Sequence, residues 1–232
     1  MRLDDPAVVR EEYADETRLA ARKKAHASAE GRDARDVVFE AVAEVSPRRI
    51  LEVGCGEGEL AERMARELHA AVAAIDQSVR MVELTRGRGI DAHVGDVQDL
   101  EFADGSFDCA LAAWVLFHVA DQDRALAELA RVLRPGGRLV AATNGRDHVR
   151  ELYDLVGREP PATTFNAENG AESLGRHFSR VDRTDVHGWF VFPDAAAAQA
   201  YVDSMVVLSG TVPDVEGPIR ARRTPCVFVA DK

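Results

Sequence analysis

The residues best placed to do chemistry are three alternate glycines, Gly54, Gly56 and Gly58. They follow a short apolar strand pattern at 50–53 and precede a helical pattern at 60–68. Glycines leave no side chain in the way of a ligand, and the first N–H groups of the following helix point out of the turn. The pattern therefore predicts a nucleotide-binding turn.

The glycine spacing separates two classes of cofactor. A dinucleotide fingerprint needs Gly-x-Gly-x-x-Gly, and Glu59 stands where the third of those glycines belongs. Acids at Glu57 and Glu59, beside a helix N-terminus, make a poor site for a doubly charged pyrophosphate. A cofactor with an amino acid tail and no phosphate fits better, which makes an NAD dehydrogenase the weakest interpretation.

Five segments between Arg49 and Asn144, taken in order, resemble the class I S-adenosylmethionine-dependent methyltransferases, of the methyltransferase type 11 kind. Besides the glycine turn they are 72–76, 93–100, 104–119 and 131–140. The resemblance implies S-adenosyl-L-methionine as the cofactor. It also implies a Rossmann-like α/β fold, with a mostly parallel seven-stranded sheet, an antiparallel last strand and helices on both faces, in agreement with the alternation of strand and helix patterns.

The resemblance also assigns roles to residues. Asp76 would bind the two ribose hydroxyls, Asp96 and the N–H of Val97 would bind adenine, and backbone near Ala113 would meet the methionine part. Without the resemblance, Asp76 and Asp96 could simply cap helices. The predicted cofactor-binding residues are Glu52, Gly54, Gly56, Gly58, Asp76, Gln77, Met81, Asp96, Val97, Ala113, Tyr13 and Arg22.

The chain is predicted to form one methyltransferase domain over 1–232. It would comprise an N-terminal helical lid (1–35), a cofactor-binding core (36–145) and a C-terminal half (146–232) with a substrate-side insertion at about 188–223. The periodicity predicts helices and strands outside the motifs as well. The helices are expected at 7–29, 36–45, 147–156, 167–178 and 194–208, and the strands at 180–187 and 226–230.

Acceptor choice is expected to lie outside the core. The segment 13–26 would close over the cofactor, where Arg22 could neutralise the cofactor's carboxylate. Tyr13, Arg22 and His26 could equally form only a polar helix face. The aromatic run 189–192 could wall a pocket for an apolar or aromatic acceptor.

No residue is assigned a catalytic role, and His118 and His26 are candidates only. The mechanism implied by the resemblance is in-line displacement at a sulfonium methyl, which positioning alone can accelerate. A base is needed only where the acceptor must lose its proton early. A packed or solvent-facing role for His118 is an equal alternative, and Trp114 and Phe117 are expected in the core and pocket wall.

Charge limits the partners. The chain has 29 Lys and Arg against 40 Asp and Glu, a net charge of -11, which repels a phosphate backbone unless a basic patch compensates. The clusters 22–24 and 220–223 are interpreted as solvated faces or helix ends. A small-molecule acceptor is therefore favoured over nucleic acid. An RNA or protein methyltransferase and a non-catalytic S-adenosylmethionine or S-adenosylhomocysteine-binding protein remain alternatives.

The sequence also carries expectations about surroundings. It contains no apolar run of about 20 residues, and 1–5 lacks the features of a signal peptide, so no membrane and a cytoplasmic location are expected. Cys55, Cys109 and Cys226 have no paired spacing, which predicts buried free thiols and no metal site. The sequence leaves the oligomeric state open.

Overall fold

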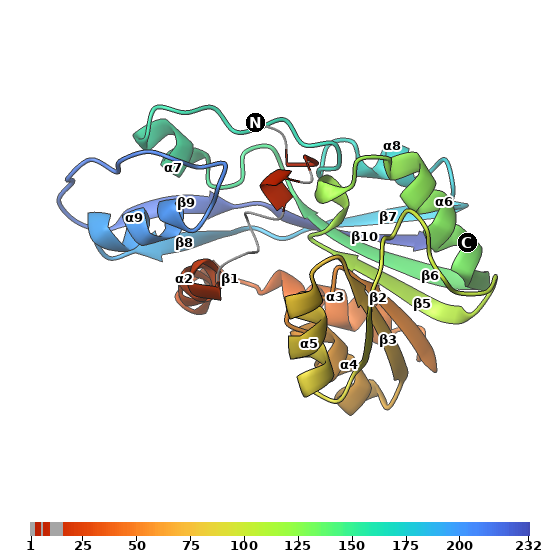
Figure 1. Ribbon diagram of the computed structural model, residues 1–232. Coiled ribbons are helices and arrows are strands. Elements are labelled where there is room, and N and C mark those ends of the chain that lie inside the picture. Colours follow the sequence, from red (N-terminus) through yellow and green to blue (C-terminus); the bar gives the residue numbers. More distant parts are fainter. Residues whose placement is uncertain (1–2, 6, 10–15) are drawn as a thin grey trace.

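A computed structural model describes residues 3–5, 7–9 and 16–232 (Figure 1). Its main feature is a seven-stranded sheet in which every neighbouring pair is parallel except those made by β10. This confirms the predicted fold class. The strand order is β4 (Asp91–Val94), β3 (Ala71–Asp76), β2 (Arg49–Val53), β5 (Phe107–Ala113), β6 (Leu133–Asn144), β10 (Pro225–Asp231) and β7 (Arg180–Asp185).

Helices cover both faces of this sheet, as Figure 1 shows. One face carries α3 (Ala34–Ala43), α4 (Glu59–Leu68) and α5 (Val79–Gly87). The other carries α6 (Gln122–Val132) and the short α8 (Gly170–Leu174). Strand β2 is buried from Ile50 to Val53, as expected for a strand covered on both faces.

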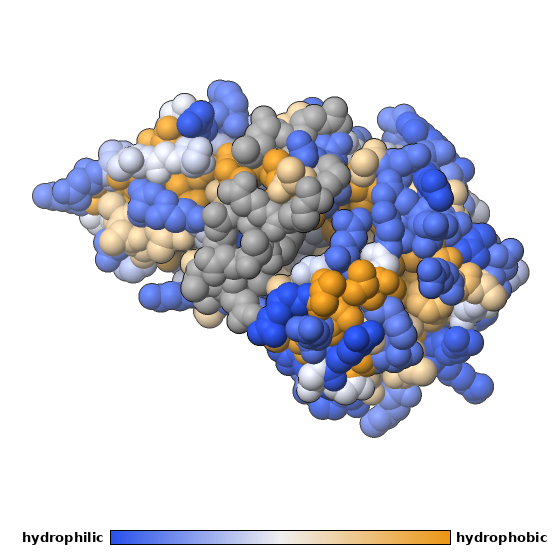
Figure 2. Space-filling view, in the orientation of Figure 1, coloured by the Kyte–Doolittle hydropathy of each residue, from blue (hydrophilic) through white to orange (hydrophobic). Residues whose placement is uncertain are grey.

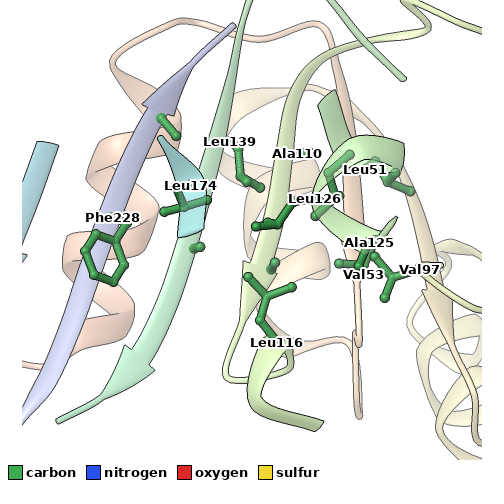
Figure 3. Packing of buried hydrophobic residues seen from close by; sticks show 14 of the residues in the cluster. Leu51, Val53, Val97, Ala110, Leu116, Ala125, Leu126, Leu139, Leu174 and Phe228 are labelled. Carbon is green, nitrogen blue, oxygen red and sulfur yellow. The ribbon is translucent and has the colours of Figure 1, made fainter. Parts of the chain in front are cut away.

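Figure 3 shows the core on the α6 side, where buried side chains from strands β2, β5, β6 and β10 meet those of the helices. Leu51 and Ala110 lie beside Leu126 of α6, while Leu174 of α8 packs near Phe228. These side chains are fully or almost fully excluded from solvent. The sheet is therefore a rigid support for the loops at its edge.

A second, three-stranded antiparallel sheet stands beside the first. It is formed by β1 (Glu30–Gly31), β8 (Gly188–Phe192) and β9 (Ile219–Arg223). Around it lie α2 (Glu16–Ala27), α7 (Arg150–Leu155) and α9 (Ala195–Asp203), seen at the left of Figure 1. These elements enclose a third hydrophobic core.

The two sheets are joined by one long hairpin. The β7–β10 pairing begins at Arg180↔Asp231, and the β8–β9 pairing ends at Phe192↔Ile219, with the same register throughout. The strands 180–192 and 219–231 therefore run almost without interruption from the large sheet into the small one (Figure 1).

This arrangement corrects two expectations from the sequence. The cluster 220–223 is not a helix end, because it belongs to strand β9, and it is a solvated face only in part, because Arg220 and Arg222 are exposed whereas Arg223 is only 4% exposed. The aromatic run 189–192 belongs to β8, where Phe190 and Phe192 pack against Tyr201 in the third core. Alternation along each strand turns successive side chains to opposite faces, which the cluster-based interpretation ignored.

Several predicted elements exist with shorter bounds. The helix expected at 167–178 is reduced to α8, and the one at 194–208 ends at Asp203. The helix expected at 7–29 is seen at 7–9 and as α2, while 10–15 lies outside the described residues.

The three cysteines are free and buried, as predicted. None of the helices in the described part of the chain is long and apolar enough to cross a membrane. Hydrophilic side chains cover most of the face in Figure 2, with smaller hydrophobic areas between them.

Candidate active site

The glycine turn joins β2 to α4 and takes the shape that its sequence predicts. Gly54, Gly56 and Gly58 all adopt left-handed backbone angles, with φ of 68°, 52° and 76°. A Cβ at Gly54 would lie 2.4 Å from Cγ2 of Val115, so a larger residue cannot be accommodated there. A Cβ at Gly56 would meet no described atom within 4 Å, which leaves the backbone of the turn open to a ligand.

A cavity of about 510 Å³, here called the donor cavity, opens at this turn. Four of the predicted cofactor-binding residues form part of its wall, and the rest of the wall comes from α2, α3, α4, the glycine turn and the residues just before α3 and just after β5. The lining residues are Lys23, Asp33, Arg35, Asp36, Glu52, Gly54, Cys55, Gly56, Glu57, Glu59, Leu60, Arg63, Ala113 and Trp114.

Glu52 is the most unusual group in the donor cavity. It is 3% exposed, and burial, aided by the nearby Asp76 carboxyl, raises its pKa to about 8. The backbone N–H of Ala61 in α4 donates a hydrogen bond to it and partly opposes that shift. Among the described residues, Oε2 of Glu52 has no hydrogen-bond partner. A buried carboxyl with one unsatisfied oxygen is suited to a cationic or hydrogen-bond-donating ligand.

Asp76 stands at the end of β3, beside the turn. Its Oδ2 accepts a hydrogen bond from the backbone N–H of Gly56 (3.0 Å), and its Oδ1 accepts one from Ser78 (2.9 Å). Burial raises the pKa of Asp76, and these two donors oppose the shift. The carboxyl is thus fixed in orientation while each oxygen retains capacity to accept another hydrogen bond.

The remaining predicted residues continue along the same sheet edge. Asp96 follows β4, where its carboxyl accepts a hydrogen bond from the backbone N–H of Gln98 (2.8 Å). Gly95 donates its N–H to the Asp76 carbonyl (3.1 Å), which holds the ends of β3 and β4 together. Gln77 is exposed, and Val97 is 5% exposed.

The structure brings the predicted residues together only in part. Glu52, Gly54, Gly56 and Ala113 line the donor cavity, whereas Asp76, Asp96, Gln77, Val97 and Gly58 do not. Met81 is 2% exposed and is one of the buried residues of α5. Arg22 lines a different cavity, and Tyr13 lies outside the described residues. Their roles toward a cofactor remain predictions.

A second cavity, here called the acceptor cavity, has a volume of about 290 Å³ and lies between the two sheets. Its walls include side chains of α2, the segment after β6, α9 and β9. Phe117 and Trp114 are in the wall, as the sequence predicted. Three residues, Asp33, Arg35 and Trp114, line both cavities, so the two spaces adjoin.

Trp114 sits at this junction in a conformation rare for a residue with a side chain. Its φ is 55°, in the left-handed region. The backbone N–H donates to the Ala142 carbonyl (2.8 Å), and the indole Nε1–H donates to Oδ1 of Asn144 (3.3 Å). Strain of this kind persists only where neighbouring contacts hold it, and it is frequent at functional sites.

Three histidines line the acceptor cavity, and the hydrogen bonds of two of them show which ring nitrogen carries the proton in the neutral form. Nδ1 of His148 accepts the N–H of Thr224 (3.2 Å), so its neutral ring carries the proton on Nε2. Nδ1 of His118 lies 2.8 Å from the Leu3 carbonyl, which can only accept, so its lone pair is on Nε2. Burial lowers the pKa of His118.

His26 is also held in its neutral form. Desolvation, followed by the cations Arg223 and Arg35, lowers its pKa to about 4. Its ring meets Phe190 edge-on, with the ring centres 5.0 Å apart. His26 and His118, the two candidates from the sequence, are thus both neutral bases in the acceptor cavity wall near neutral pH.

Sequence reasoning missed Lys23, which connects α2 to the glycine turn. Its ammonium forms ion pairs with Glu57 and with Glu59, the latter at 2.7 Å. The signal was present, because two acids at a helix N-terminus need a counterion. The N-terminal helix therefore contacts the donor cavity through Lys23, whereas Arg22 turns toward the acceptor cavity.

Comparison with known proteins bears on this architecture. Residues 51–141 match a family model described as a methyltransferase domain. An O-methyltransferase of Penicillium expansum is 36% identical over 151 residues, which make up 59% of this chain and 54% of that protein. The chain spans about half, or less, of the length of the curated relatives it matches.

Two solved structures show the same fold at low identity. The cyclase SpnF has a TM-score of 0.60 at 22% identity, covering 85% of this chain and 80% of its own. An N-methyltransferase of Haemonchus contortus, solved with S-adenosylhomocysteine, has a TM-score of 0.59 at 17% identity, covering 85% and 52%. With the strand order and the glycine turn, the family match identifies residues 51–141 as a methyltransferase domain, and the fold around it is that of the class I S-adenosylmethionine-dependent methyltransferases.

Proposed function

We propose that this protein transfers the methyl group of S-adenosylmethionine to a small-molecule acceptor. The observation that carries the proposal is the contact between two cavities, one at the glycine turn and one between the sheets, with Trp114 in both walls. A donor and an acceptor held in adjoining spaces gain the rate enhancement of proximity and orientation.

The donor cavity fits the methionine end of this cofactor. Glu52 offers a buried carboxyl oxygen that, within the described part of the chain, has no partner, and an ammonium group would satisfy it. Asp76, oriented by Gly56 and Ser78, would accept hydrogen bonds from the ribose hydroxyls. Asp96 would receive the adenine amino group. Acids at each of these positions suit hydrogen-bond donors and a cation, and they disfavour a pyrophosphate.

When bound, S-adenosylmethionine would supply an electrophilic methyl group on a sulfonium. The acceptor atom would form its bond to that methyl carbon as the carbon–sulfur bond breaks, which would leave S-adenosylhomocysteine. A proton lost from the acceptor passes to His26 or His118, whose neutral rings line the acceptor cavity. Trp114, fixed by Asn144, keeps the shape of the junction.

The second cavity supports this acceptor class. Its volume of about 290 Å³ and its aromatic walls, including Phe117, Tyr153 and Phe165, suit a small apolar body better than a polymer. The similar protein of Penicillium expansum is an O-methyltransferase, which supports an oxygen as the methylated atom. The net charge of -11 further disfavours nucleic acid.

Two measurements test the proposal. Calorimetry should show binding of S-adenosylmethionine and S-adenosylhomocysteine and none of NAD, whereas NAD binding alone would refute it. Radiolabelled methyl transfer should then occur with members of a panel of small phenols and hydroxy acids. Binding of both sulfur compounds with transfer only to RNA or protein, or with no transfer at all, would assign the chain to one of the alternative classes.

A further inference from the structure

The acceptor cavity contains a buried cation that the methyl-transfer chemistry does not use. Arg223 is the last residue of β9, is 4% exposed and lines the cavity. Its guanidinium carbon lies 5.2 Å from the centre of the Phe190 ring. Strand alternation explains its position, because Ile219, Ala221 and Arg223 share the buried face of β9.

The other two arginines of this strand are on the opposite face and are paired. Arg220 forms a two-pronged ion pair with Glu30, at 2.5 and 3.2 Å. Arg222 binds Glu151 through its side chain (2.7 Å) and its backbone N–H (2.9 Å). Arg223 has no ion pair with any residue that the structure describes, and its Nε has no hydrogen-bond partner there.

The carboxylate of Asp33, which could have neutralised Arg223, already binds another cation. Asp33 attracts Arg223 at a distance, but both of its oxygens bind the guanidinium of Arg35, at 2.7 to 3.2 Å. Oδ1 also caps α3 through the N–H of Arg35 (2.9 Å). The attraction of Asp33 is therefore shared, and Arg223 keeps an uncompensated charge in the cavity wall.

The histidines and arginines around Arg223 add no negative charge to that of Asp33. His26 and His148 are held neutral, with pKa values lowered to about 4 and about 3, and Arg223 contributes to both shifts. Arg22 and Arg35 line the same cavity. In a protein with a net charge of -11, this wall is a local concentration of positive charge.

A buried guanidinium is costly unless it is paired and hydrogen-bonded. An Arg that presents Nε together with one terminal nitrogen matches the two oxygens of a planar carboxylate. Much of the remaining cavity wall is aromatic and aliphatic, and it includes Tyr201, Met205 and Val207. The site thus combines one anchor for an anion with space for an apolar body.

We propose that the acceptor is a carboxylic acid with an apolar or aromatic body, and that Arg223 binds its carboxylate. This inference rests on the proposed function, in that the bound acid would be the methyl acceptor at another of its atoms. Arg223 then determines the specificity for the acceptor and its orientation.

The test compares 2-naphthoate with its neutral analogue 2-naphthamide, measured by calorimetry and ligand-observed NMR with and without saturating S-adenosylhomocysteine. The wild type should bind the carboxylate at least about tenfold more tightly, as expected for a charge-assisted pair. Arg223→Gln should abolish this preference. Arg220→Gln removes the same charge from the outer face of the same strand and should keep it.

The outcomes separate this inference from the proposed function. If S-adenosylhomocysteine does not bind, methyl transfer is refuted, while the ligand pair without cofactor still tests Arg223. Equal binding of acid and amide by the wild type, an unchanged preference in Arg223→Gln, or stronger binding of phenyl phosphate than of any carboxylate would overturn the inference. So would failure of a panel of aryl and alkyl acids to bind at millimolar concentration.

A second variant tests whether the role of Arg223 is purely structural. Arg223→Met keeps an unbranched side chain of similar length without the charge, so removing an uncompensated buried cation should leave the melting temperature of the free protein unchanged or raised. A clear fall in the melting temperature, together with unchanged carboxylate binding, would show that Arg223 only supports the small sheet.

Discussion

Replacing Glu52 by Gln tests how the donor cavity recognises its ligand. With a pKa of about 8, Glu52 holds its proton in about nine-tenths of free molecules at pH 7. A ligand that places an ammonium against the unpartnered oxygen requires the ionised form. Ionising Glu52 at pH 7 costs about 1.4 kcal/mol, and the charged hydrogen bond gained returns about 1.5–3 kcal/mol.

The wild-type affinity for S-adenosylhomocysteine should therefore rise up to about tenfold per pH unit from pH 6 to 8 and then level off. Glu52→Gln should remove this dependence. At pH 8.5 the variant should bind about 10- to 150-fold more weakly, whereas near pH 6 the two proteins should differ little. Calorimetry in buffers of different ionisation enthalpy would show proton release by the wild type below pH 8.

The same shift has a consequence for stability. The folded state holds the Glu52 proton more tightly than the unfolded chain does, so stability falls as the pH rises from about 4.5 to about 8. The Gln variant lacks this loss and should melt above the wild type at pH 8.5. Glu62→Gln, which alters an acid paired with Arg88 on the surface, is the control. A wild-type affinity independent of pH, or an unchanged affinity of Glu52→Gln at pH 8.5, would refute the reasoning.

Three further changes have defined outcomes. Asp76→Ala should weaken S-adenosylhomocysteine binding by about one to two orders of magnitude, since two hydroxyl hydrogen bonds to a charged acceptor are lost. Asp91→Ala, on the next strand, should leave the affinity unchanged. If the two variants bind S-adenosylhomocysteine equally well, Asp76 serves only as a local cap. Lys23→Met should leave the melting temperature nearly unchanged, because exposed ion pairs contribute about 0–1 kcal/mol. The same variant should be cleaved faster by thermolysin within 16–27, and Lys24→Met is the control. Equal cleavage of the two variants would show that the contacts of Lys23 with Glu57 and Glu59 do not hold α2 in place. Burial lowers the pKa of His148 to about 3, so the unfolded chain takes up this proton near pH 6.5 and the folded protein only near pH 3. Stability should therefore fall as the pH is lowered from about 6.5 to about 3. The melting temperature of His148→Gln should fall less over this range than those of the wild type and the control His93→Gln, and parallel falls in all three proteins would contradict the assignment.

The sequence predicted the large sheet well because its strands are marked by continuous apolar runs and by turns with restricted chemistry. Gly54, Gly56 and Gly58 require a left-handed backbone, and Asp76 sits at a strand end, so each can be placed without tertiary information. The order of the segments, read through a family resemblance, then supplied the mostly parallel sheet with its antiparallel last strand. None of this required knowledge of contacts between distant residues.

The acceptor side was less predictable because its features depend on pairing between remote segments. Arg223 is buried only because β9 pairs with β8, and β8 with β1. A cluster of three arginines in sequence is split by strand alternation into two surface ion pairs and one buried cation. Lys23 likewise acquires its role by meeting acids more than thirty residues away.

The continuous register of the hairpin from 180 to 231 has a consequence for how new specificities can arise. Its two strands extend the hydrogen-bonding of the large sheet directly into the wall of the acceptor cavity, so Arg223 is positioned by the same framework that supports the donor side. The connection 193–218, which carries Tyr201 and Met205, joins that framework covalently at the hairpin's far end and packs against β8 through Tyr201. Exchanging this connection would change the shape of the cavity that an acceptor enters, while Arg223 and the donor cavity stay in place. Evolution can therefore change the substrate through one segment without altering the residues that hold the methyl donor.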